Sequence, residues 1–280
     1  MKYVTLSNGI KMPQLGFGVY QTPLAETERC VSEAIEVGYR SIDTAQAYGN
    51  EEGVGAAVAK SGIPRDQFFI TTKVWITNAG YENAKASIEE SLRKLRTDYV
   101  DLLLVHQPFN DYYGTYRAME EAYRAGKVKA LGVSNFYPDR LIDIANFVEI
   151  PPMVNQVETH VFWQQKEERK FMDKYNVQIM SWGPFAEGKN DYFNNPVLKE
   201  IGKKYGKTVG QTALRFLLQE DVVLIPKTVH RERMVENFTI FDFALTDEDM
   251  DEIRGLDTGA SLFFHHETGE TAELFMRFLK

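Results

Sequence analysis

The chain has 280 residues, of which 44% are hydrophobic and 26% charged, so its composition supports a large core and argues against extended disorder. Its net charge of -8 argues against a nucleic-acid or anionic-membrane partner. The single cysteine, Cys30, cannot form an internal disulfide, and we expect it to be buried on a helix. No segment approaches the ~20 apolar residues of a membrane span, and no apolar signal-peptide run opens the chain, so we expect a cytoplasmic protein.

Short apolar or β-branched runs recur along the chain and predict strands. The first residues carry an Asn8-Gly9 turn, which predicts a β-hairpin that plugs one end of the fold. Several later runs lack strict alternation of polar and apolar residues, as is typical of parallel strands covered by helices. The eight runs are residues 15–19, 39–44, 68–74, 100–106, 130–135, 153–158, 178–183 and 222–227.

The segments between these runs have the spacing of amphipathic helices. Residues 25–38 close on Gly38, a residue type that commonly follows a helix, and residues 208–220 begin with Thr208, which can cap a helix start. Eight strand–helix pairs without a break in composition predict a single (β/α)8 barrel domain over residues 1–280. An open doubly wound sheet is the alternative, disfavoured because no Gly-x-Gly-x-x-Gly follows any strand.

Polar residues end several of the predicted strands, and in a barrel the carboxyl ends of the strands line the active site. Asp43, Lys73 and His106 end the second, third and fourth strands, and Tyr48 lies in the loop after Asp43. Lys73 and His106 follow apolar runs, where an unpaired polar group would be costly to bury. We interpret the three strand-end residues as members of one functional site.

Seven motifs in register resemble the aldo-keto reductase family from about residue 3 to about residue 265. They are GYRSIDTAQAYGNEEGVG, ITTKVW, DLLLVHQP, GVSNF, NQVE, SWGP and IPKTVHRERMVEN. The chain is most similar in type to short prokaryotic members such as diketogluconate and methylglyoxal reductases. The resemblance implies a (β/α)8 barrel that reduces an aldehyde or ketone to an alcohol with NADPH.

The family's catalytic tetrad falls on Asp43, Tyr48, Lys73 and His106. Hydride addition to a carbonyl leaves an alkoxide that needs a proton, and Tyr48 would supply it as general acid. We expect Lys73 to lower the pKa of Tyr48 from its ordinary value of about 10, and Asp43 to keep Lys73 charged. His106 would hydrogen-bond the substrate oxygen and orient the carbonyl.

The resemblance also assigns residues to the cofactor. Nicotinamide contacts fall on Ser134, Asn135, Gln156 and Trp182. The loop after the seventh strand supplies Gly183, Pro184 and Phe185, in a region where barrels often hold phosphate. Lys227, Thr228 and Arg233 match the residues that bind the 2′-phosphate as a clamp. Glu236 and Asn237 match the residues that contact the adenine.

By position in the family, the substrate pocket would be walled by Tyr20, Trp75 and Phe109, together with His106. Gln107 stands where many members have Trp, which predicts a more polar pocket and small or polar carbonyl substrates. The tail after residue 260 is short, and we expect His265 and His266 to lie on the surface. We expect a monomer with a small-molecule carbonyl substrate and without a metal.

Other activities are compatible with parts of this pattern. A Schiff-base aldolase could use Lys73 on the same barrel, without a cofactor. Metal-assisted hydrolysis is weakly supported, because the five histidines show no His-x-His or His-Glu-x-x-His spacing. A non-catalytic cofactor-binding subunit could retain the barrel and the same residues.

Overall fold

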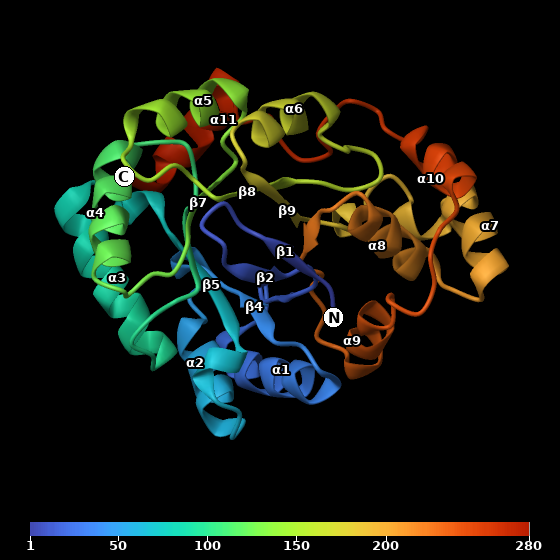
Figure 1. The fold of residues 1–280 in the computed structure, drawn as a ribbon, viewed down its shortest axis with the longest axis horizontal. Helices are drawn as coiled ribbons and strands as arrows, with labels where there is room; N and C mark the ends of the chain where they lie inside the picture. The colour runs from blue at the N-terminus through green and yellow to red at the C-terminus, as the bar shows by residue number, and fades with distance from the viewer. Residues whose placement is uncertain (280) are drawn as a thin grey trace.

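A computed structural model describes residues 1–279. It contains a barrel-like sheet of eight parallel strands, and Figure 1 shows its arrangement within the ring of helices. The sheet order is β3 to β10 in sequence order, as expected when each strand is followed by a crossover to its neighbour. The strands are β3 Phe17–Gly18, β4 Ser41–Asp43, β5 Phe69–Val74, β6 Leu102–Val105, β7 Leu131–Ser134, β8 Val154–Glu158, β9 Gln178–Trp182 and β10 Val223–Leu224. Each lies within a predicted run, so the barrel prediction is confirmed.

The sheet nearly closes on itself between its first and last strands. Leu15 and Leu224 form a parallel bridge, flanked by hydrogen bonds from Gly16 N to Leu224 O (2.7 Å) and from Leu224 N to Gln14 O (2.9 Å). A Cβ on Gly18 would lie 2.7 Å from the carbonyl oxygen of Ile225, so glycine permits the approach of the two strands at this seam.

A ring of helices surrounds the barrel (Figure 1). The helices are α1 Leu24–Val37, α2 Glu51–Lys60, α3 Tyr81–Leu95, α4 Tyr112–Arg124, α5 Pro138–Phe147, α6 Lys166–Lys174, α7 Pro196–Tyr205, α8 Val209–Gln219, α9 Arg231–Phe238, α10 Asp247–Arg254 and α11 Gly269–Met276. As predicted, α1 ends at Gly38, which has a φ of 124°, and α8 begins after Thr208, which forms a capping box with Gln211. None of these helices is long and apolar enough to cross a bilayer.

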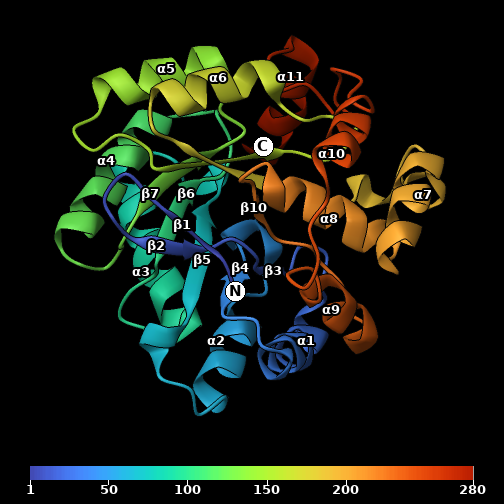
Figure 2. The ribbon, with the colours of Figure 1, turned by 45° about the vertical axis from the view of Figure 1, so that its right-hand side comes forward.

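The N-terminal hairpin, β1 Tyr3–Thr5 and β2 Lys11–Pro13, lies across the strands in Figure 2. Its side chains Leu6 and Met12 are buried together with Phe69 and Leu102, which are the first residues of β5 and β6. The hairpin therefore plugs the N-terminal end of the barrel, as the Asn-Gly turn predicted. The opposite end, where the strands finish, is left for the site.

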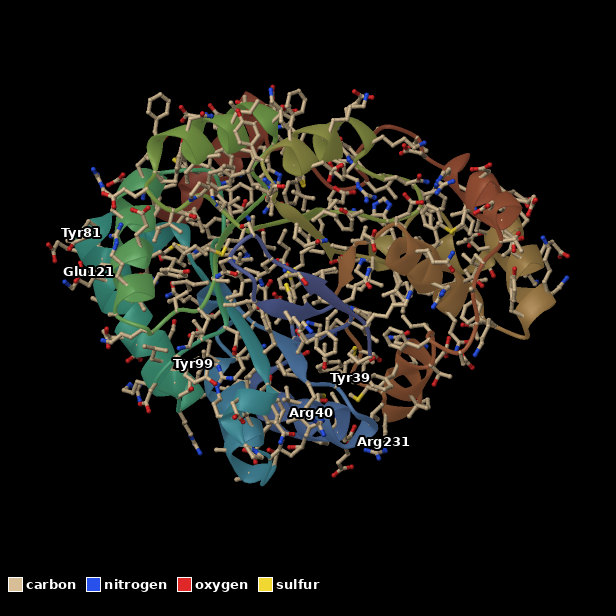
Figure 3. All side chains as sticks on the ribbon, viewed as in Figure 1. Tyr39, Arg40, Tyr81, Tyr99, Glu121 and Arg231 are labelled. Atoms are coloured by element: carbon tan, nitrogen blue, oxygen red, sulfur yellow. The ribbon has the colours of Figure 1, made fainter. Side chains whose placement is uncertain are left out.

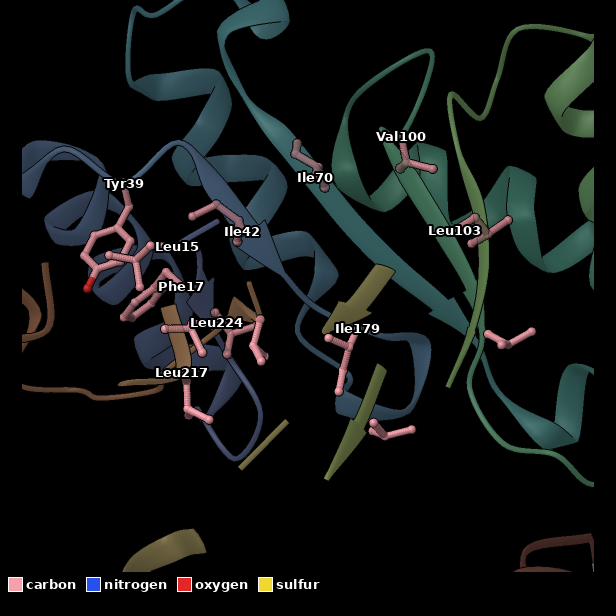
Figure 4. Packing of buried hydrophobic residues seen from close by; sticks show 14 of the residues in the cluster. Leu15, Phe17, Tyr39, Ile42, Ile70, Val100, Leu103, Ile179, Leu217 and Leu224 are labelled. Atoms are coloured by element: carbon pink, nitrogen blue, oxygen red, sulfur yellow. The ribbon is translucent and has the colours of Figure 1, made fainter. Parts of the chain in front are cut away.

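The main core fills the layer between the outside of the strands and the helices (Figure 4). Ile42, Ile70, Leu103, Ile179 and Leu224 contribute from the strands to this layer, and Cys30 of α1 is buried within it. Because side chains alternate across a strand, the neighbours of these residues point into the barrel.

The helix ring closes where α9 meets α1. The buried hydroxyl of Tyr39 donates to Met234 O at 3.1 Å, and exposed Arg231 forms a 2.7 Å ion pair with Glu36 (Figure 3). Between α3 and α4 on the outside of the ring, Tyr81 donates to Glu121 (Figure 3). Such exposed pairs contribute little to stability, so burial by the barrel core holds the ring together.

Candidate active site

Strand alternation aims the predicted catalytic residues at one point inside the barrel. Ile42 faces the helices, so Asp43 beside it faces inward, and the same alternation turns Lys73 inward from β5. His106 directly follows β6, after outward-facing Val105. Because the strands are parallel, their carboxyl ends meet at one end of the barrel.

Lys73 is the centre of the cluster, and its side chain is 0% exposed. Its Nζ donates to Asp43 Oδ1 at 2.6 Å, to the carbonyl of Thr44 at 2.9 Å and to the hydroxyl of Tyr48 at 3.2 Å. The second oxygen of Asp43 accepts from Gln156 Nε2 at 3.0 Å. All three ammonium protons and both carboxylate oxygens therefore have partners, which is what a buried ion pair requires.

Tyr48 is presented by a short 3-10 helix, Gln46–Tyr48, between β4 and α2. The side chain of Gln46 fixes this turn, because its Oε1 accepts from Trp75 N at 3.0 Å and its Nε2 donates to Ser91 at 3.1 Å. Gly49, with a φ of 66°, ends the turn. The hydroxyl of Tyr48 is thereby held above Lys73 at the floor of a cavity.

His106 is buried between two aromatic rings, with Tyr48 at 5.7 Å and Trp75 at 5.0 Å between ring centroids. Its Nδ1 has no hydrogen-bond partner among residues 1–279. Burial, reinforced by the charge of Lys73, lowers the pKa of His106 well below its ordinary value of 6.5. The imidazole is therefore neutral at neutral pH and has one N–H to donate.

The pKa of Tyr48 shifts in the direction opposite to our expectation. Burial, followed by the nearby Asp43 carboxylate and Tyr20, raises the pKa of Tyr48 well above its ordinary value of 10. The expected lowering by Lys73 is wrong for this structure, because the phenolate would be desolvated and Asp43 offsets the field of the ammonium. Tyr48 thus keeps its proton at neutral pH.

Burial also shifts the pKa values of Asp43 and Lys73. It raises the pKa of Asp43 above its ordinary value of 3.8, against the lowering effect of Lys73. It lowers the pKa of Lys73 below its ordinary value of 10.5, against the raising effect of Asp43. Each group thus depends on the other for its charge.

A cavity of about 780 Å³ opens above this cluster. Most of the predicted site residues contribute to its wall, although they come from separate strands and loops. They are Tyr20, Asp43, Tyr48, Trp75, His106, Ser134, Asn135, Gln156, Trp182, Gly183, Pro184, Phe185 and Lys227.

Phe109 does not line this cavity and is a correction to the predicted pocket. It lines a neighbouring cavity of about 220 Å³, and its ring stacks at 5.3 Å on Phe275, which does face the main cavity. Phe275 of the tail therefore lies between Phe109 and the main cavity.

Four predicted adenosine contacts also lie outside the cavity, on the loop after β10 and on α9. Thr228 is buried and its hydroxyl accepts from His230 N at 3.1 Å, while Asn237 is buried on the helix. Glu236 accepts a 2.6 Å hydrogen bond from Thr208, and Arg233 is exposed. Only Lys227 of the predicted clamp reaches the cavity itself.

The C-terminal tail supplies a wall that the sequence reasoning missed. Its lining residues are Phe263, Phe264, Leu274, Phe275 and Phe278. Although Gln107 also lines the cavity, this wall makes it more aromatic than the expectation of a polar pocket suggested. The signal in the sequence was the density of aromatic residues in "SLFF" and "ELFMRFLK" within an otherwise polar tail.

Two contacts, one partly buried and one buried, hold the tail against the barrel. Glu158 at the end of β8 accepts hydrogen bonds from the Ser261 hydroxyl and from Leu262 N, the latter at 2.9 Å. His266 is buried, with its Nε2 2.9 Å from Gln107 Oε1, so the expectation that it lies on the surface is wrong; His265 is exposed as expected. Aromatic neighbours cover His266, which local sequence does not reveal.

Among residues 1–279, no group of three or more His, Cys, Asp or Glu side chains is placed to hold a metal ion. The chemistry of the cavity wall instead suits an organic cofactor. Trp182 presents a partly exposed ring, and Ser134, Asn135 and Gln156 place hydroxyl and amide groups beside it.

Comparison with known proteins identifies the family. The family model described as "Aldo/keto reductase family" matches residues 13–258. Glyoxal reductase of Bacillus subtilis (strain 168) is 46% identical over 255 residues, which cover 90% of this chain and 92% of that protein. The range that the family model matches spans the positions of all seven motifs named above.

Solved structures agree with the sequence comparison. MGS-M4, an aldo-keto reductase enzyme from a Medee basin deep-sea metagenome library, matches with a TM-score of 0.92 and 42% identity over 95% of this chain and 98% of that chain. An aldo-keto reductase of Bombyx mori in complex with NADP matches with a TM-score of 0.87 and 30% identity over 92% and 94% of the two chains. The chain therefore belongs to the aldo/keto reductase family, and as a member it is an oxidoreductase that uses NADP(H).

Proposed function

We propose that this protein uses NADPH to reduce small aldehydes and dicarbonyl compounds to alcohols. One observation carries the proposal: the Tyr48 hydroxyl lies 3.2 Å from Lys73 Nζ, beside the neutral imidazole of His106, at the floor of the cavity. A protonated phenol and a neutral N–H donor, both within reach of one carbonyl oxygen, suit the reduction of that carbonyl.

A nicotinamide cofactor, when bound, would supply the hydride that adds to the carbonyl carbon. Tyr48 gives its proton to the carbonyl oxygen, so the C=O bond becomes an alcohol and the phenol becomes a phenolate. Lys73, already donating to the Tyr48 oxygen, stabilises that phenolate as its charge develops. Asp43 keeps Lys73 protonated, and the N–H of His106 donates to the carbonyl oxygen and orients the carbonyl above Tyr48.

The residues at the cavity wall fit a nicotinamide cofactor. Trp182 offers a flat face for the nicotinamide ring, and Asn135 and Gln156 offer amides for the carboxamide. Lys227 lies at the wall, and Arg233 on α9 forms no ion pair with residues 1–279, so both cations are available to a phosphate. We assign the 2′-phosphate of NADPH to these two residues with Thr228, and the adenine to Glu236 and Asn237.

The substrate class follows from the other end of the cavity. Tyr20, Trp75 and the tail residues Phe275 and Phe278 form an aromatic wall beside Tyr48 and His106. The chain is 46% identical to a glyoxal reductase, which supports a two-carbon or three-carbon dicarbonyl as substrate. Short aldehydes and keto sugars are the next classes to test.

A Schiff-base aldolase is less well supported by the same geometry. Lys73 is fully buried, all three of its protons are engaged, and it does not line the cavity. An aldolase lysine must instead present a free amine to the carbonyl carbon. Borohydride added with substrate should leave Lys73 unmodified, and a trapped adduct would favour the aldolase.

The proposal is tested by adding NADPH to the protein with a panel of glyoxal, methylglyoxal, short aldehydes and keto sugars. We expect loss of NADPH absorbance with the dicarbonyls, and formation of one alcohol for each NADPH consumed. NADPH binding without consumption across the panel would favour a non-catalytic cofactor-binding subunit.

A further inference from the structure

His266 links the C-terminal tail to the residue beside His106. It lies between α10 and α11, is 6% exposed, and places Nε2 2.9 Å from Oε1 of Gln107. Gln107 directly follows His106 and lines the main cavity. This side chain is absent from the proposed mechanism, yet it contacts the wall of the site from a segment 159 positions away.

The contact continues through a row of amides to the proposed nicotinamide site. Gln107 Oε1 also accepts from Asn135 Nδ2 at 3.3 Å. Asn135 Oδ1 in turn accepts from Trp182 Nε1 at 2.8 Å. Four side chains, His266, Gln107, Asn135 and Trp182, therefore form one connected row, which we call the amide row.

The hydrogen bonds of the row fix the direction of the Gln107 amide. Trp182 Nε1 can only donate, so Asn135 must turn Oδ1 toward Trp182 and Nδ2 toward Gln107. Gln107 must then present Oε1 to Asn135 Nδ2 as the acceptor. The same oxygen faces His266, so His266 must carry its proton on Nε2.

The ring of His266 is itself held in place by aromatic neighbours. It stacks on Phe109, Tyr137 and Phe275 at centroid distances of 6.2, 6.0 and 5.7 Å. Burial lowers the pKa of His266 to about 3, so the ring is neutral at neutral pH. Its Nδ1 is buried and has no partner among residues 1–279, which leaves Nε2 as its single polar contact.

We propose that His266 is a positioning residue for the nicotinamide end of the cofactor, acting through Gln107 on Asn135 and Trp182. The inference rests on the proposed function, because it assumes that Asn135 and Trp182 contact the cofactor. It predicts that the Nε2–H donor of His266 supports binding of the nicotinamide half and leaves binding of the adenosine half unaffected.

The test compares two ligands and two substitutions. His266→Phe keeps a flat ring in the aromatic stack and removes the donor, whereas His266→Gln restores an N–H donor. Affinities are measured for NADPH and for adenosine 2′,5′-bisphosphate, which lacks the nicotinamide. We expect His266→Phe to weaken NADPH about three- to tenfold, the size of one lost neutral hydrogen bond, with adenosine 2′,5′-bisphosphate unchanged and His266→Gln within about twofold of the unmutated protein.

Two controls separate this role from simple packing. His265→Phe alters the neighbouring exposed histidine, which lies outside both cavities, and should leave both affinities unchanged. Gln107→Leu removes the acceptor, so His266→Phe should add nothing in that background. Gln107→Leu also provides the same ligand comparison if His266→Phe does not fold.

The outcomes separate this inference from the function on which it rests. Equal weakening of both ligands by His266→Phe, or unchanged NADPH binding, would overturn the positioning role alone. Additive effects of His266→Phe and Gln107→Leu would also overturn it. Failure of the unmutated protein to bind NADPH would overturn the proposed function, and the inference with it.

Discussion

Lys73 Nζ lies 2.6 Å from Asp43 Oδ1 in the interior of the barrel, and neither side chain is more than 2% exposed. Desolvation of two charges costs about as much as their attraction returns, so such a pair is weak evidence for a stabilising role. The hydrogen bond from Lys73 to the hydroxyl of Tyr48 explains the presence of the ion pair better. The pair keeps a positive charge fixed beside the group that we propose as the acid.

Removal of Lys73 should therefore affect both stability and turnover. Lys73→Met leaves Asp43 as a buried carboxylate without its cation, and we expect the free energy of unfolding to fall by about 3–5 kcal/mol. Denaturant unfolding at neutral pH measures this directly. The double variant Lys73→Met with Asp43→Asn is the control: it should recover most of the stability and none of the activity. An unchanged unfolding free energy in Lys73→Met would contradict the coupling.

The stability deficit of Lys73→Met should shrink as pH falls. Burial raises the pKa of Asp43 above 3.8 in the folded protein, and loss of Lys73 removes the main opposing effect. A carboxyl whose folded pKa is raised favours the folded state while it is protonated, and that contribution is lost as pH rises through the folded pKa. The difference between the unfolding free energies of the two proteins should narrow as pH falls from neutral toward the ordinary carboxyl pKa of about 4; a constant difference would count against Asp43 as the cause.

The pH dependence of reduction follows from the raised pKa of Tyr48. Because this pKa lies well above 10, the phenol stays protonated, and kcat/KM for reduction should be flat between about pH 7 and about pH 9. The measurement requires that chemistry limits the rate, which a deuterated cofactor can establish. A decline of kcat/KM within this range, absent from Tyr48→Phe, would contradict the raised pKa. It would show that Lys73 lowers the pKa of Tyr48 by more than burial raises it.

We predict that the preference for NADPH over NADH depends on Arg233, an exposed cation of α9. One charge-assisted contact to the 2′-phosphate would contribute about 1.5–3 kcal/mol. Arg233→Ala should therefore weaken NADPH at least about tenfold and leave NADH nearly unchanged. Arg231→Ala is a matched control on the same helix, because Arg231 is already paired with Glu36. Equal Kd values for NADPH and NADH in the unmutated protein would refute the assignment.

Much of the fold and of the catalytic cluster was accessible from the sequence. The strands are apolar runs bounded by turn residues, and Asp43, Lys73 and His106 each sit at the end of such a run. Parallel strands finish at one end of a barrel, so three strand-end residues distant in sequence could be placed together. The N-terminal hairpin could also be predicted from the sequence, because Asn8-Gly9 favours a tight turn between two strands.

The features that we did not predict from the sequence depend on packing between residues that lie far apart in the chain. The burial of His266 arises from rings brought in by Phe109, Tyr137 and Phe275, which belong to three different segments. The direction of the pKa shift of Tyr48 depends on how completely the cavity floor excludes water, which a motif does not encode. The tail wall likewise follows from the anchoring of Ser261 by Glu158.

The most direct test of Tyr48 as the general acid compares the unmutated protein with Tyr48→Phe. Single-turnover reduction of methylglyoxal is followed with NADPH prebound, together with the Kd for NADPH. We predict a fall in the rate of about 10²–10⁴-fold, the range of general acid catalysis, with an unchanged Kd, because only the proton donor is removed. A variant that keeps more than about a tenth of the rate would contradict Tyr48 as the acid.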